Sequence, residues 1–140
     1  MGCIKIKKMI MSYNTNIVEE TKKNNNFRTV LFTGAKSQIV VMEIPPGGEV
    51  GEETHERVEQ ILFFLSGFCT AFLNEEERKL GPGDVVVVTS GTKHNFVNTG
   101  TVPLKIYTVY APPNHIDGRV HKTKEDADKD TLDEDFGHSQ

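Results

Sequence analysis

Four residues in the middle of the chain have side chains that commonly bind metal ions: Glu53, His55, Gln60 and His94. Glu53 and His55 are two residues apart, so an extended backbone would direct both side chains to the same side. Gln60 needs a turn or bulge at residues 56–58 to face the same way, and only tertiary structure can bring His94 close. Two imidazoles, one carboxylate and one amide oxygen would suit a first-row divalent ion. The spacing leaves open that His55 is an ordinary surface residue of a charged loop.

The elements that must position these residues are short apolar runs that end at turn-forming residues. The runs cover residues 27–32, 38–44, 58–65, 68–73, 84–88, 95–97 and 104–110. Strand-forming residues dominate each run, and no helix-period pattern of useful length follows Phe27, so the sequence predicts an all-β sandwich or barrel.

The run at residues 58–65 has two apolar faces. Its second face carries Ile61, Phe63 and Leu65, which cannot all be exposed to water if the first face lines a barrel. We therefore expect this face to pack on another sheet or on a second subunit, and we predict a homodimer.

The spacing of the candidate ligands resembles the two signature segments of the cupin family, G-x5-H-x-H-x3–4-E-x6-G and G-x5-P-x-G-x2-H-x3-N. This chain has Gly47-x5-Glu53-x-His55-x4-Gln60-x6-Gly67 and Gly83-x5-Thr89-x-Gly91-x2-His94-x3-Asn98. Three positions depart from the family pattern. Glu53 stands where a histidine ligand belongs, Gln60 where the glutamate ligand belongs, and Thr89 where a turn proline belongs.

The resemblance implies a double-stranded β-helix, a jelly-roll barrel that holds a divalent transition metal such as Zn, Ni, Mn or Fe. The implied metal ligands are Glu53, His55, Gln60 and His94. Glu53 would be a candidate catalytic base if it does not bind the metal. The shorter family spacing would make Glu59 the ligand, but strand parity places Glu59 on the face opposite Gln60, so Gln60 is preferred.

The residues that follow the last strand resemble the closing segment of a small cupin subgroup, often described as mannose-6-phosphate isomerase-like. His115 or His121 could fold over the barrel mouth and reach a ligand there, or both could be surface residues of the tail. The candidates for contact with a small-molecule ligand are Phe64, Phe72, Phe96, Tyr107 and His121. The aromatic residues among them are expected mainly in the core.

The chain divides into three parts. Residues 1–16 are expected to be a flexible N-terminal extension, residues 17–121 the barrel, and residues 122–140 a charged tail. Acidic and basic residues alternate in the tail, which predicts a short solvated helix or disorder. A methionine at position 11 leaves open whether the preceding residues belong to the mature chain.

Composition narrows the possible partners. The formal net charge is -4 over 140 residues, which argues against binding to nucleic acid. No apolar stretch approaches the roughly 18 residues needed to span a bilayer, so no membrane association is expected. Only Cys3 and Cys69 occur, and neither belongs to a disulfide framework, which favours the cytoplasm.

Two functions agree with these observations. The first is a metal-binding cupin that acts on a small polar metabolite, with isomerase-like or oxygenase-like chemistry at the metal. The second is a non-catalytic sensor or small-ligand-binding cupin, in which the metal site is weak or absent.

Overall fold

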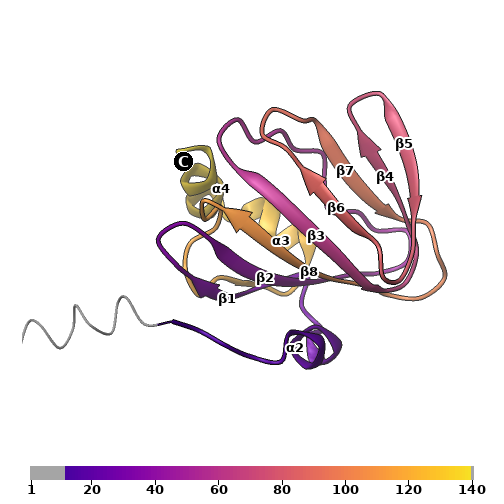
Figure 1. Cartoon of the computed structure of the whole chain (residues 1–140), viewed down its shortest axis with the longest axis horizontal. Coiled ribbons are helices and arrows are strands. Elements are labelled where there is room, and N and C mark those ends of the chain that lie inside the picture. The colour runs from indigo at the N-terminus through magenta and orange to yellow at the C-terminus, as the bar shows by residue number, and fades with distance from the viewer. Residues whose placement is uncertain (1–11, 140) are drawn as a thin grey trace, which may run out of the picture.

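The computed structural model describes residues 12–139, in which two antiparallel β-sheets face each other and short helices lie near both ends (Figure 1). The larger sheet has the strand order β6-β3-β8-β2-β1-β9, and the smaller has the order β5-β4-β7. The strands are β1 (Arg28–Thr33), β2 (Gln38–Ile44), β3 (Glu59–Ser66), β4 (Cys69–Leu73), β5 (Glu76–Leu80), β6 (Val85–Val88), β7 (His94–Asn98), β8 (Leu104–Ala111) and β9 (Val120–His121). This arrangement confirms the predicted all-β barrel.

The core lies between the two sheets and is formed by alternate residues of the strands. In β3, Gln60, Leu62 and Phe64 are buried, whereas the intervening residues are half-buried. Phe64 of the larger sheet meets Phe96 of the smaller sheet, with ring centroids 5.7 Å apart. Burying an aromatic or large aliphatic side chain contributes about 1.5–3 kcal/mol each, so this layer holds the two sheets together.

A short helix covers part of the outer face of the larger sheet. Helix α2 (Ile17–Lys23) begins at Asn16, whose side chain accepts a hydrogen bond from the backbone of Glu19. It lies against β8 and β2, and the outward-facing Lys105 donates to the carbonyl of Lys22. The sequence pattern did not predict this helix, because it has only two turns and no apolar stripe.

The rest of the outer face remains partly open. Phe63 stacks on Tyr107 there, and Val85 and Val87 at the β6 edge are 52% and 55% exposed. This surface is compatible with the expected subunit contact, and the homodimer stays a prediction.

The C-terminal segment forms two helices, α3 (Lys124–Lys129) and α4 (Thr131–His138). Asp130 ends α3 and caps α4, because its side chain accepts a hydrogen bond from the backbone of Asp133. Of the two predicted states of the tail, a helix or disorder, the structure shows helices, but they are not simply solvated, since Asp133 is buried. Within residues 12–139, no helix is long and apolar enough to cross a membrane.

Candidate metal centre and barrel mouth

The structure brings Glu53, His55 and His94 to one end of the space between the sheets. The backbones of Glu53 and His94 form an isolated antiparallel bridge, with two N–H···O bonds of 2.9 Å. Paired residues in such a bridge direct their side chains to the same face. The imidazole rings of His55 and His94 lie 5.3 Å apart between centroids, so residues far apart in sequence meet as the spacing predicted.

His94 has its ring held with one nitrogen free for a ligand. Its Nδ1 lies 2.8 Å from the carbonyl oxygen of Thr92, and a carbonyl can only accept, so Nδ1 carries the proton and donates it. Burial lowers the pKa of His94, which keeps the ring neutral near pH 7. The Nε2 lone pair is therefore available, as in histidines that bind metals in proteins.

His55 is also held in the neutral form. Burial and, to a smaller extent, the nearby His94 together lower its pKa to about 4. The ring also packs at 6.4 Å from Tyr110, edge to face. Two neutral imidazoles side by side are the arrangement that a divalent transition metal requires, because a protonated ring cannot bind it.

Gln60 reaches the barrel interior, whereas Glu59 is exposed on the other face. The Gln60 Nε2 donates to Thr108 Oγ1 at 3.1 Å, and Thr108 Oγ1 donates its own proton to the Ile61 carbonyl at 2.9 Å. Because that hydroxyl proton is already used, the amide must donate to Thr108 and cannot be reversed. Its Oε1 is thus the atom left for another partner.

Glu53 lies at the edge of this site. Burial raises the pKa of its carboxyl group, and the negative charge of Glu134 raises it further. Glu53 and His55 line a pocket of about 60 Å³ at the barrel mouth, and α3 and α4 form its other wall. The ligand atoms of Glu53, His55 and His94 do not all lie within 4.8 Å of one another. The candidate metal site is therefore centred on His55 and His94, whose rings lie close together, and Glu53 stands at its edge.

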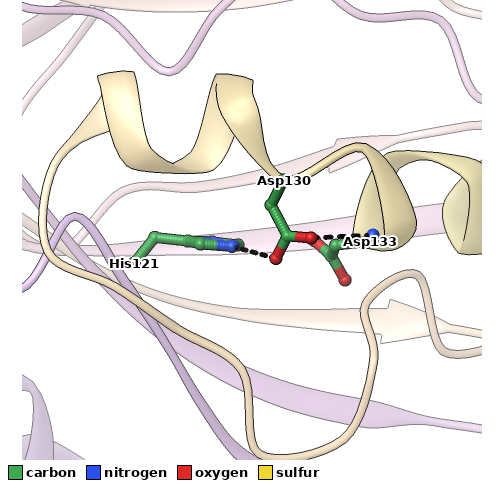
Figure 2. A group of neighbouring side chains, drawn as sticks. All are labelled: His121, Asp130 and Asp133. Carbon is green, nitrogen blue, oxygen red and sulfur yellow. Dashed lines mark hydrogen bonds and ion pairs between the residues drawn. The ribbon is translucent and has the colours of Figure 1, made fainter.

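A second cluster of potential ligands lies between β9 and the C-terminal helices (Figure 2). One ligand atom from each of His121, Asp130 and Asp133 lies within 4.8 Å of the others, a group that could hold a metal ion. Among residues 12–139, it is the one group of three histidine, cysteine or carboxylate side chains whose ligand atoms lie this close together.

The atoms of this second cluster already have partners in the protein. His121 Nε2 lies 2.9 Å from Asp130 Oδ2, and Arg119 donates to the same oxygen at 2.9 Å. Arg28 lies 3.3 Å from His121 Nδ1, and since a guanidinium can only donate, Nε2 carries the imidazole proton. These contacts hold α3 and α4 against β9, and a metal could enter only by replacing them.

Asp133 connects α4 to the loop after β8. One of its carboxylate oxygens accepts from His115 Nδ1 at 2.7 Å, and the other accepts from the Ile116 backbone at 2.7 Å. Burial and, to a smaller extent, the positive charge of Arg28 lower the pKa of His115 to about 4, although the Asp133 carboxylate acts in the opposite direction. The pair is therefore a neutral imidazole that donates to an ionised Asp133.

The other residues predicted to contact a ligand lie in different places. Phe64 and Phe96 belong to the closed core. Phe72 is half-buried and lines a separate surface pocket next to His94, while Tyr107 stacks on Phe63 on the outer face of the larger sheet. His121 belongs to the cluster beside β9.

Sequence reasoning missed the residues that complete the barrel mouth. Tyr110 is buried inside, on the face of its strand opposite to Tyr107, and parity alone does not indicate which of the two faces is the inner one. Arg28 and Asn114 line the pocket with His115, and no local pattern of residues indicates their role.

Comparison with known proteins gives a consistent family. The model of the family described as "Cupin domain" matches residues 40–110. The uncharacterized protein YrkC of Bacillus subtilis (strain 168) is 42% identical over 118 residues, which cover 80% of this chain and 63% of YrkC. The chain thus spans less than two thirds of that relative's length.

Two solved structures are similar to this fold. The crystal structure of BH2720 from Bacillus halodurans has a TM-score of 0.82 and 35% identity, and the match covers 84% of this chain and 93% of that one. A Thermotoga maritima protein described as a predicted oxalate decarboxylase has a TM-score of 0.54 and 29% identity over 56% of this chain and 69% of that one. The strand topology, the paired histidines and the family match together show that this chain belongs to the cupin family.

Proposed function

We propose that this protein binds a divalent transition metal through His55 and His94 and acts on a small polar metabolite at the barrel mouth. The observation that carries the proposal is the pair of neutral imidazoles, one of which is oriented by the Thr92 carbonyl with its Nε2 free. Gln60 Oε1 is the further ligand candidate, and Glu53 is a candidate for either binding the ion or moving a proton.

The donor set fits the metal implied by the family. Two neutral histidine nitrogens suit zinc, nickel, manganese and iron, and an amide oxygen is a weaker but compatible donor. A metal bound here would supply Lewis-acid chemistry that polarises a hydroxyl or carbonyl oxygen of the substrate.

The chain's own residues would supply the remaining functions. The carboxyl group of Glu53, whose pKa is raised by burial, is placed to accept a proton at Oε and return it. The pocket wall formed by α3 and α4 limits the access of water to His55 and Glu53.

The second function, a sensor or binding module without catalysis, is favoured by Gln60. An amide in place of a carboxylate removes one negative charge from the ligand set, which weakens the attraction of a dication. Because a module of this kind would still bind a ligand in the same pocket, the two functions differ in turnover and not in binding.

Thermal denaturation of metal-free protein tests the metal site. We expect Tm to rise with added zinc or nickel and to fall back to the value of the metal-free protein when EDTA is added. A ligand that binds only the folded state stabilises it by about 2.7 kcal/mol at 100 times its Kd. Metal analysis of the same samples after gel filtration should give close to one ion per chain. No shift with zinc, nickel, manganese or iron would contradict the proposal.

A further inference from the structure

Three buried polar atoms of the described chain have no hydrogen-bond partner, and all three belong to residues that line the pocket at the barrel mouth. They are Arg28 Nε, Asn114 Oδ1 and His115 Nε2. Buried polar groups in folded proteins are almost always paired, so a cluster of unpaired ones in a single pocket requires an explanation. A bound polar molecule would supply the missing partners.

The protein fixes which of these atoms accept and which donate. His115 Nδ1 donates to Asp133, so its Nε2 is an acceptor without a partner. Asn114 Oδ1 is a second acceptor, and Arg28 Nε is a donor. His115 and Asn114 are 6% and 5% exposed, so bulk water does not satisfy them. The missing molecule must therefore both donate and accept.

The charges around the pocket narrow its chemistry. Arg28 has no carboxylate within ion-pair distance in the part of the chain that the structure describes, so no direct partner neutralises its charge. However, one guanidinium is outnumbered by the carboxylates that line the same pocket, Glu53, Asp128, Asp133 and Glu134. These carboxylates would repel a negatively charged ligand, whereas they would tolerate a neutral or a positively charged one.

We propose that this pocket binds a polyhydroxylated small molecule without negative charge, with adjacent hydroxyl groups that donate to His115 Nε2 and Asn114 Oδ1 and accept from Arg28 Nε. A hydroxyl group both donates and accepts without adding charge. The pocket of about 60 Å³ takes only a few heavy atoms, so it holds one end of such a molecule. This inference rests on the proposed function for the statement that the molecule is the substrate, but its binding requires no metal.

The test is a titration of the metal-free, ¹⁵N-labelled full chain, followed by ¹H–¹⁵N correlation spectra. The three probes are glycerol, which is neutral, glycolate, which is an anion, and ethanolamine, which is a cation. We expect glycerol and ethanolamine to shift the amide signals of Arg28, Asn114 and His115 at concentrations where glycolate does not. Because the protein carries no metal, this result is independent of whether His55 and His94 bind one.

Variants separate the hydrogen bonds from the charge. Arg28→Lys keeps the charge but removes Nε, and we expect roughly tenfold weaker binding of glycerol, the loss of about one hydrogen bond. His115→Ala should give a similar loss if α4 remains docked. The matched variant Glu134→Gln should leave glycerol binding unchanged and strengthen glycolate binding, because it removes one lining charge.

Three outcomes would overturn the proposal. Stronger binding of glycolate than of glycerol to the unmodified protein would show that the charge argument is wrong. Equal glycerol shifts in Arg28→Lys would show that Nε has no role. The absence of shifts with all three probes would mean that water alone satisfies these atoms.

Discussion

Replacing His94 by alanine is expected to weaken the binding of zinc or nickel by at least roughly 100-fold, and His55→Ala should do the same. Each change removes one of two neutral imidazoles whose rings lie 5.3 Å apart. The remaining histidine, with an amide and a half-buried carboxyl, cannot hold a first-row ion tightly. Isothermal titration calorimetry of the metal-free proteins measures the difference.

His138→Ala is the matched control for this prediction. His138 lines the same pocket as His55, but its side chain is 59% exposed and lies 3.8 Å from Glu134. Its removal should change the metal affinity by less than a few-fold. Equal losses in all three variants would mean that the ion binds at the outer pocket wall and not inside the barrel.

Asp133→Ala is expected to lower the free energy of unfolding by about 2–4 kcal/mol, because it leaves His115 Nδ1 and the Ile116 N–H buried without an acceptor. Both contacts join α4 to the loop after β8, so α4 should also become accessible to proteases. Urea denaturation and limited proteolysis measure the two effects.

Asp135→Ala provides the comparison for the change at Asp133. Asp135 lies on the same helix and has the same charge, but it is exposed. The free energy of unfolding of the Asp135→Ala variant should lie within about 0.5 kcal/mol of that of the unmodified protein. If Asp133→Ala is no less stable than Asp135→Ala, the contacts of Asp133 do not hold the helix in place.

Most of the barrel could be predicted from the sequence because its signals are local. Alternating apolar residues end at Gly67, Gly83 and Gly91, each of which adopts a positive φ angle that favours glycine. The spacing of the signature segments also predicted that His55 lies near His94, because these glycines fix the turns between the intervening strands. The choice of Gln60 over Glu59 followed from strand parity and agrees with their burial.

The barrel mouth could not be predicted in the same way because its contacts are polar and long-range. The tail has few apolar residues, so its charge pattern is typical of a solvated segment. Its docking depends on Asp133 with His115, 18 residues away, and on Asp130 with His121. Single residues of this kind show no periodicity, and only the folded chain reveals that they meet.

Anomalous X-ray diffraction from crystals of the protein grown with zinc would locate the bound metal ion. We predict a peak between the His55 and His94 rings, at about 2.0–2.1 Å from a nitrogen of each. A peak at His121, Asp130 and Asp133, with none between His55 and His94, would contradict the proposed metal site and assign the metal to the cluster beside β9.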